Sequence, residues 1–299
     1  GCRITYEGIG SSGGIRAFMA TEVDFGATDI YLSDSEMDSS SADILHIPTC
    51  IGAVAVIYNL PGSPKLRLSP EVLAEIFSGK ITRWNDRQIR RLNSGGLLPD
   101  LPIRVVHRSD GSGTTFLFTD YLCKVSRDWE DAIGRGKTVR WPTGFGLEGN
   151  PGVSGFVQRV EGGIGYVSAS YVERTGLPAT ALRNSSGNYI LPTLESISKA
   201  ASGELPADAR ILITNTEADD GYPISAFTYL LVFREQKYKG RSLERAKCLK
   251  GLLLWMLHEG QIYNESLMYA PLPGTAVSIV DKIIDRMTFD GASIVLDEP

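Results

Sequence analysis

The chain has 299 residues, of which 42% are hydrophobic and 22% are charged. This composition is typical of a globular protein with enough apolar residues for a core, and the length fits one large domain or two smaller lobes. Thirty Lys and Arg residues against 35 Asp and Glu residues give a net charge of −5, which argues against nucleic acid as the main partner. A small anion stays among the permitted ligands, because local donors hold it rather than the field of the whole protein.

Segments typical of strands and helices alternate along the chain. We expect strands at 3–7, 23–27, 51–58, 103–107, 163–167 and 224–233. We expect helices at 13–21, 70–78, 114–124 and 247–258. The clearest boundary is Ser69-Pro70, an N-cap and a first-turn proline, in a helix that stops before Gly79. Because strands and helices alternate, the sequence predicts an α/β fold with largely parallel sheets, and ligands then bind beyond the carboxyl ends of the strands. No run of about 18 uncharged apolar residues is present, so we expect no transmembrane helix.

Four cysteines, Cys2, Cys50, Cys123 and Cys248, are widely spaced and form no CxxC motif. This spacing argues against a metal site. It is compatible with up to two disulfides in an oxidising compartment and equally with buried free thiols. Gly1-Cys2 resembles the end of a lipoprotein cleavage site, but a cysteine that starts a strand makes a poor lipid anchor.

Two segments place small residues between an expected strand and an expected helix, at 8–14 (GIGSSGG) and 108–115 (RSDGSGTT). Small residues let the backbone approach a ligand, and the free N–H groups at the start of the helix then face an anion. Hydroxyl groups add donors for a tetrahedral oxyanion. Taken alone, each segment fits a tight capped turn better than a ligand site. Neither ends in the Gly-Lys-Ser/Thr of a P-loop, so binding of a nucleoside triphosphate is not supported.

Three charged residues make the anion hypothesis sharper. Arg108 can donate two hydrogen bonds to an oxyanion, and Asp110 could hold its guanidinium in place, although a surface salt bridge is the alternative. Asp29 suits an anion site only if the anion carries a proton, as HPO4 does and sulfate at neutral pH does not. Asp29 would then accept a hydrogen bond from phosphate and repel sulfate. By its local pattern alone, Asp29 is an ordinary helix cap or turn residue.

Several runs of residues match one known family in order. They are 6–14 (YEGIGSSGG), 23–29 (VDFGATD) with 32–34 (LSD), 79–86 (GKITRWND), 107–115 (HRSDGSGTT), 163–167 (GIGYV) and 222–224 (YPI). With these runs the sequence resembles the bacterial phosphate-binding proteins of the Pst transporter, which are periplasmic binding proteins. The resemblance is close over 4–233 and looser beyond, and the run RSDGSGT is its most specific part.

The resemblance implies a set of site residues. The phosphate-binding residues would be Ser11, Asp29, Arg108, Ser112, Gly113 and Thr114. Two further residues, Ser12 and Asp110, would support them. Asp29 would accept the proton of phosphate, and Arg108 would fork onto the anion while Asp110 holds it. Ser11 would donate through its N–H and hydroxyl groups, and the start of the second helix would supply the other donors.

The resemblance also implies a fold and a role. The fold is an α/β, two-lobe, hinged periplasmic-binding-protein fold of type II, with mixed, mostly parallel sheets flanked by helices. One lobe would comprise 1–52 plus 222–299 and the other 53–221. The protein would capture inorganic phosphate outside the cytoplasm and deliver it to the membrane permease of an ABC importer. We expect a monomer without cofactor, metal or nucleic acid, in the periplasm or outside the cell, where a further N-terminal segment could tether it to the membrane.

The sequence departs from the family at its start. The family begins with a further strand and a Gly-Ala-Thr-Phe type turn that adds phosphate donors, and this sequence starts after that point. We therefore expect it to be part of a longer protein. The segment 289–293 (FDGAS) does not replace the turn, so a circular permutation is not indicated. A chain without the turn would bind phosphate less tightly, by roughly 1.5–3 kcal/mol for each missing donor.

Other classes of function were weighed against binding. An enzyme acting on phosphate esters would need a metal cluster or an activated nucleophile, but His46, His107 and His258 are scattered. His107 adjoins Arg108, yet neighbouring side chains of a strand point to opposite faces. A phosphate-sensing, adhesion or matrix protein with the same fold stays open, as does arsenate as a ligand. The four tryptophans, Trp84, Trp129, Trp141 and Trp255, indicate packing rather than an aromatic ligand.

Overall fold

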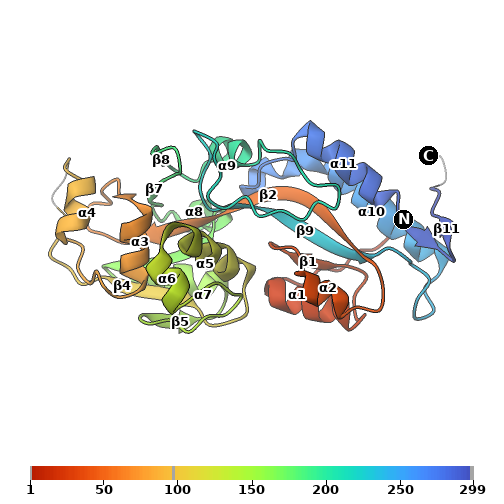
Figure 1. The fold of residues 1–299 in the computed structure, drawn as a ribbon, viewed down its shortest axis with the longest axis horizontal. Coiled ribbons are helices and arrows are strands. Elements are labelled where there is room, and N and C mark those ends of the chain that lie inside the picture. The colour runs from red at the N-terminus through yellow and green to blue at the C-terminus, as the bar shows by residue number, and fades with distance from the viewer. Residues whose placement is uncertain (1, 96–97, 297–299) are drawn as a thin grey trace.

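The computed structural model describes residues 2–95 and 98–296. Its elements form two lobes connected by two long strands, β2 (Ile44–Tyr58) and β9 (Ser225–Phe233), as Figure 1 shows. The first lobe contains α1 (Gly10–Met19), β1 (Gly26–Thr28), α2 (Asp34–Asp38), α10 (Leu243–Leu257) and α11 (Gly274–Ile284). The second lobe contains α3 (Pro70–Phe77), α4 (Arg87–Leu92), β4 (Arg104–Arg108), α5 (Gly113–Val125), α6 (Arg127–Ala132), β5 (Phe145–Leu147), α7 (Gly149–Arg159), β6 (Gly163–Ser168) and α8 (Ser170–Thr175).

The remaining elements are short. They are β3 (Arg67–Leu68), β7 (Ala181–Arg183), β8 (Tyr189–Ile190), α9 (Leu194–Ala200), the 3-10 helices η1 (Glu259–Tyr263) and η2 (Glu265–Leu267), β10 (Thr288–Phe289) and β11 (Ala292–Ser293). The alternation of strands and helices places the protein in the α/β class, as the sequence predicts.

One six-stranded sheet runs through both lobes in the order β1-β9-β2-β6-β4-β5. Strand β2 pairs with β9 from Ile44 to Ala53 and then with β6 from Val54 to Tyr58, so a single strand serves both lobes. The sheets are mixed, but the expectation of mostly parallel pairing is wrong among the described strands. Only β4 with β5 and β6, and β3 with β7, are parallel there. Antiparallel pairing prevails because the chain enters the second lobe along β2 and returns along β9.

The ends of a helix were predicted accurately where its capping residues are close to it in sequence. Helix α3 begins at Pro70, and the Ser69 hydroxyl accepts a hydrogen bond from the Val72 N–H at 3.4 Å. The helix ends before Gly79, whose φ of +78° favours glycine. The other expected helices and strands are found with shifted ends, except the first strand.

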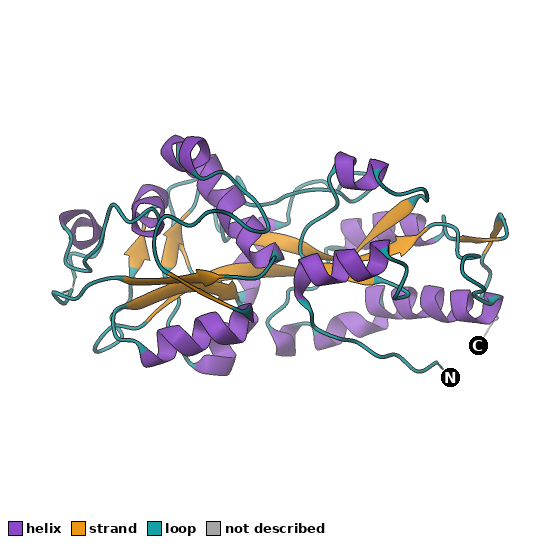
Figure 2. Cartoon of the chain, turned by 90° about the horizontal axis from the view of Figure 1, so that it is seen from below, coloured by secondary structure: helices purple, strands orange, loops and turns teal. Residues whose placement is uncertain are grey.

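The expected strand at 3–7 is wrong. Residues 2–9 have no regular secondary structure, are exposed, and are drawn as a loop in Figure 2. A strand needs a hydrogen-bonding neighbour, and in the described part of the chain β1, beside this segment, pairs only with β9. A disulfide between Cys2 and Cys248 attaches the loop to α10, whereas Cys50 and Cys123 are buried free thiols.

The core follows the long strands. All residues of β2 are buried, and Trp84 and Trp129 pack in the core, as expected for tryptophans without an aromatic ligand. Trp141 stacks on His107 with ring centroids 4.7 Å apart, so His107 packs away from Arg108. Trp255 departs from this pattern because it is 45% exposed. Among the described residues, no helix combines the length and apolar character that a membrane span requires.

Candidate anion-binding site

The two glycine-rich turns that the sequence singled out meet between the lobes. Helix α1 brings Ser11 and Ser12 from the first lobe, and the turn before α5 brings Gly111 and Gly113 from the second. A Cβ atom added to Gly111 would lie 2.8 Å from the Ser12 Cβ. A Cβ atom added to Gly113 would lie 3.1 Å from the Asp29 Oδ2 and closer still to the Ser11 hydroxyl. Glycine is therefore required for this close approach, which brings the starts of α1 and α5 into contact.

Arg108 ends β4 and is buried, with 7% of the residue exposed. Its Nε donates to Asp110 Oδ1 at 2.7 Å, and its Nη2 donates to Oδ2. Asp110 also accepts the Gly149 N–H at 3.0 Å. Burial opposes ionisation of Asp110, but the hydrogen bonds from Arg108 and Gly149 outweigh it and lower the pKa of this carboxyl. The pair is thus a buried, oriented cation rather than a surface salt bridge.

Asp29 lies directly after β1 on the opposite side of the site. Its N–H donates to the Ser11 hydroxyl at 3.2 Å, and its Oδ1 accepts from the Thr228 hydroxyl at 3.1 Å. Burial raises the pKa of Asp29, although the hydrogen bond from Thr228 and the charge of Arg108 oppose the shift. Asp29 is not a helix cap, because Ser33 caps the following helix α2. Its carboxyl group is thus a buried hydrogen-bond acceptor at the site.

The start of α5 supplies hydrogen-bond donors. Ser112 is the N-cap, and its hydroxyl accepts the Thr115 N–H at 3.2 Å. The first-turn N–H groups of Gly113 and Thr114 have no acceptor within the helix. Ser112 and Thr114 are buried, so these donors lie in a place with little competing water. The predicted site residues therefore lie together where the start of α1 meets the turn before α5.

Three further residues shape the site and were missed from the sequence. Thr228 reaches Asp29 from β9, across 199 residues of sequence. The Tyr166 hydroxyl accepts the Arg108 N–H at 3.1 Å and bonds to the Thr115 hydroxyl at 2.8 Å. Asn150 accepts the Ser168 N–H at 3.2 Å, and its amide oxygen lies 3.5 Å from Arg108 Nη1. Tyr166 stood in a recognised run, but nothing local marked Thr228 or Asn150.

A cavity of about 890 Å³ adjoins the site. It extends along the outer edge of β1 and is bounded by the loop before α1, by α8 and by residues 266–269. Ser11, Asp29, Asn150 and Thr228 reach its wall, whereas Arg108 does not. The anion site thus lies at the inner end of a larger opening between the lobes.

Two lobes with a site of buried donors between them define a class of binding protein, and comparison with known proteins agrees. Residues 1–259 match the PBP superfamily domain. The phosphate-binding protein PstS of Xylella fastidiosa strain Temecula1 is 40% identical over 288 residues, which cover 94% of this chain and 77% of the relative. PstS of Pasteurella multocida is 38% identical over 278 residues, covering 91% and 79%. The chain therefore belongs to the PBP superfamily and, within it, to the family of the PstS phosphate-binding proteins.

Solved structures confirm the fold class. A human phosphate-binding apolipoprotein superposes with a TM-score of 0.72 at 20% identity, covering 91% of this chain and 86% of that chain. The periplasmic phosphate-binding protein PfluDING, bound with phosphate, gives a TM-score of 0.71 at 21% identity, covering 91% and 85%. At such low identity the likeness concerns the fold alone, and the predicted two-lobe periplasmic-binding-protein fold is confirmed.

Proposed function

We propose that the protein captures inorganic phosphate between its two lobes and delivers it to an ABC importer. The observation that carries the proposal is the buried Arg108, which is held by Asp110 and lies beside Gly10 at the start of α1. A buried guanidinium stabilises an oxyanion through charge-assisted hydrogen bonds, and the start of α5 adds backbone donors. The proposed ligand-binding residues are Ser11, Asp29, Arg108, Ser112, Gly113 and Thr114, supported by Ser12 and Asp110.

Asp29 gives the site its proposed selectivity. A buried carboxylate disfavours an anion without a proton, because no hydrogen bond offsets the repulsion. The hydroxyl group of HPO4 can donate a hydrogen bond to Asp29, whereas sulfate at neutral pH has no hydroxyl group. Asp29 is already oriented by the Thr228 hydroxyl and by its own N–H bond to Ser11, so little ordering is needed when phosphate enters. Arsenate offers the same proton and falls within the same ligand class.

The proposed lobes are 1–52 plus 222–299 and 53–221. Strand β2 supports this division, because its hydrogen-bonded partner changes from β9 to β6 between Ala53 and Val54. The return crossing precedes β9, which starts at Ser225. Rotation of the lobes about these two crossings would open and close the space between α1 and α5.

The proposed partner is the membrane permease of an ABC phosphate importer, and the proposed location is the periplasm or the outside of the cell. Relatives with the same fold include an ABC-type phosphate transport receptor from Vibrio cholerae. The disulfide between Cys2 and Cys248 supports an oxidising compartment. An enzymatic activity is not part of the proposal. His46 accepts the Leu32 N–H at 3.0 Å and His258 pairs with Asp281, so neither belongs to the site.

The experiment is calorimetry on the phosphate-stripped chain, titrated with phosphate and then with sulfate. We expect phosphate to bind and sulfate to be ignored. The Asp29→Asn variant should lose part of this discrimination, because an amide neither repels sulfate by charge nor accepts the phosphate proton as strongly. Asp38→Asn is the matched control, since Asp38 is exposed on α2. A folded chain that binds neither anion, or binds both equally, would contradict the proposed function.

A further inference from the structure

An ion pair joins the two lobes close to the anion site. Lys137 lies in the second lobe, in the connection between α6 and β5, and its Nζ is 2.5 Å from Glu36 Oε1 on α2 of the first lobe. Their side chains are 23% and 36% exposed, so water screens the pair only partly. The two residues are 101 positions apart in sequence, and only the packing of one lobe on the other brings them together.

Glu36 is oriented before Lys137 reaches it. Its Oε2 accepts the Ser33 N–H at 2.8 Å, and the Ser33 hydroxyl accepts the Glu36 N–H at 3.3 Å, which together form a capping box at the start of α2. The same Oε2 also accepts the Ser33 hydroxyl at 2.9 Å. Burial of Glu36 raises the pKa of its carboxyl, but the hydrogen bonds from Lys137 and Ser33 prevail and lower it. The carboxylate therefore stays charged and points at the opposite lobe. Because Ser33 already orients it, little conformational entropy is lost when the pair forms.

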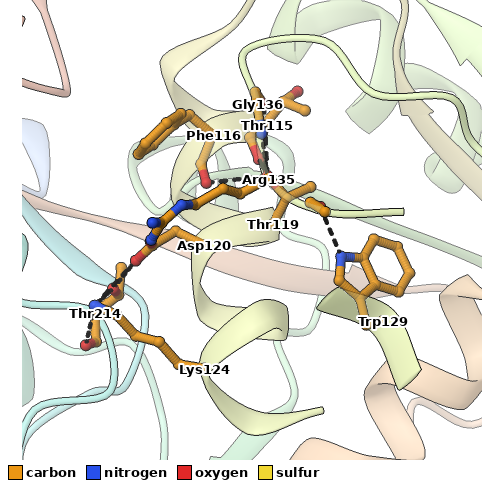
Figure 3. Close-up of polar contacts among 10 residues, drawn as sticks. Thr115, Phe116, Thr119, Asp120, Lys124, Trp129, Arg135, Gly136 and Thr214 are labelled. Atoms are coloured by element: carbon orange, nitrogen blue, oxygen red, sulfur yellow. Dashed lines mark hydrogen bonds and ion pairs between the residues drawn. The ribbon is translucent and has the colours of Figure 1, made fainter. Parts of the chain in front are cut away.

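Lys137 is attached to the helix that supplies the anion donors. Its backbone carbonyl accepts the N–H of Ser112, the N-cap of α5, at 2.9 Å. Two residues earlier, Arg135 Nη1 donates to Asp120 of α5 at 2.7 Å. The Gly136 N–H donates to the Thr119 hydroxyl of the same helix at 3.2 Å. Figure 3 shows these contacts of residues 135–136 along one side of α5.

Asp120 holds residues 135–137 rigidly against α5. It is fully buried and is contacted by Lys124 at 3.0 Å and by the Thr214 hydroxyl, besides Arg135 (Figure 3). A buried carboxylate is retained only where such partners neutralise it, and a network with all its members engaged is rigid. Residues 135–137 therefore move with α5, and a force on Lys137 acts on the helix start at Ser112.

We propose that Glu36 and Lys137 form a latch that stabilises the closed arrangement of the lobes and thereby raises the affinity for phosphate. The inference rests on the proposed function. The pair exists only when the lobes are together, so its free energy favours the closed form, and a ligand that binds the closed form gains affinity in proportion. A partly exposed pair supports a three- to tenfold effect on the dissociation constant, with most of it in the dissociation rate.

The direction in which Glu36→Gln changes the affinity for phosphate distinguishes a latch from simple electrostatic attraction of the anion. Lys137→Met removes a positive charge near the site and weakens phosphate binding under either explanation. Glu36→Gln removes a negative charge, which by attraction alone would strengthen binding. The latch predicts instead that Glu36→Gln weakens phosphate binding three- to tenfold and speeds dissociation. Glutamine still serves in a capping box, so α2 keeps its start.

The test is titration calorimetry and stopped-flow dissociation of phosphate for the wild type, Glu36→Gln, Lys137→Met and the exchanged pair Glu36→Lys with Lys137→Glu. We expect the exchanged pair to recover at least half of the lost affinity. Lys80→Met is the matched control, because Lys80 pairs with Asp128 within the second lobe, and it should leave binding unchanged. Unchanged or tighter binding by Glu36→Gln overturns the latch.

The failure of the proposed function is distinguishable from the failure of the latch. If the wild type binds no phosphate, the proposed function is wrong. The latch is then tested separately, by small-angle scattering of the ligand-free chain. A larger radius of gyration for Glu36→Gln and Lys137→Met than for the wild type and Lys80→Met supports it. Equal radii overturn it.

Discussion

The carboxylate of Asp110, in the turn that connects β4 to α5, accepts two hydrogen bonds from the guanidinium of Arg108, the last residue of β4. This pairing leaves one edge of the guanidinium for an anion and keeps the other edge fixed. The Tyr166 hydroxyl fixes the backbone of Arg108 as well. Arg108 is thus held by its side chain and by its main chain.

Replacing Arg108 by Lys should weaken phosphate binding by about 100-fold, although the charge is kept. A lysine ammonium cannot bridge Asp110 and the anion with a planar fork, and each lost charge-assisted hydrogen bond costs roughly 1.5–3 kcal/mol. Calorimetry measures the affinity, and circular dichroism checks the fold. Arg104→Lys, at the exposed start of the same strand, should bind phosphate as the wild type does.

Gly113→Ala should reduce phosphate affinity at least tenfold with little loss of stability. Alanine is favourable in a helix, but its Cβ would lie 3.1 Å from Asp29 Oδ2 and closer to Ser11, so the lobes could not close fully. The affinity is measured by calorimetry and the stability by urea unfolding. The matched change Gly251→Ala in α10, where a Cβ meets nothing nearer than 4.0 Å, should leave affinity unchanged. Equal affinities of the two variants would show that the turns do not approach in the bound form.

Tyr166→Phe should lower the free energy of unfolding by about 1–3 kcal/mol. The buried Arg108 N–H loses its acceptor at 3.1 Å and the Thr115 hydroxyl loses its partner at 2.8 Å, which leaves polar groups unsatisfied. Urea unfolding followed by fluorescence gives the value. Tyr121→Phe is the control, because the hydroxyl of this equally buried tyrosine makes a single long hydrogen bond among the described residues, at 3.5 Å to the Arg183 carbonyl. Equal losses for the two variants would mean that the hydroxyl of Tyr166 has no special role.

His46 should make the protein less stable as the pH falls from about 6.5 to about 4. Burial and the charge of Arg210 lower the pKa of His46 to about 4, so over this interval the unfolded chain binds a proton that the folded chain does not. The free energy of unfolding then decreases by up to roughly 1.4 kcal/mol per pH unit. Above pH 6.5 the residue is neutral in both states and contributes no slope. Unfolding of the wild type and of His46→Gln across this range isolates the effect, and parallel profiles would contradict it.

Local chemistry determined those parts that the sequence predicted well. Ser69 and Ser112 accept N–H groups three residues ahead, and Gly79 ends its helix through its own backbone angle. Such signals act within one turn of a helix, so they are legible in the sequence. The same holds for the Arg108–Asp110 pair, two residues apart.

Contacts between segments that are distant in sequence depended on the tertiary structure. Thr228 is placed at Asp29 by the pairing of β1, β9 and β2, and Lys137 meets Glu36 only because two lobes pack together. The segment 3–7 has a strand-like pattern but no neighbouring strand, so it remains a loop. Caps, turns and the Arg108–Asp110 pair are satisfied within a few residues and could therefore be predicted from the sequence. Strand pairing and lobe closure depend on free energies shared across the whole chain, so Thr228, Asn150 and the proposed latch could not be predicted.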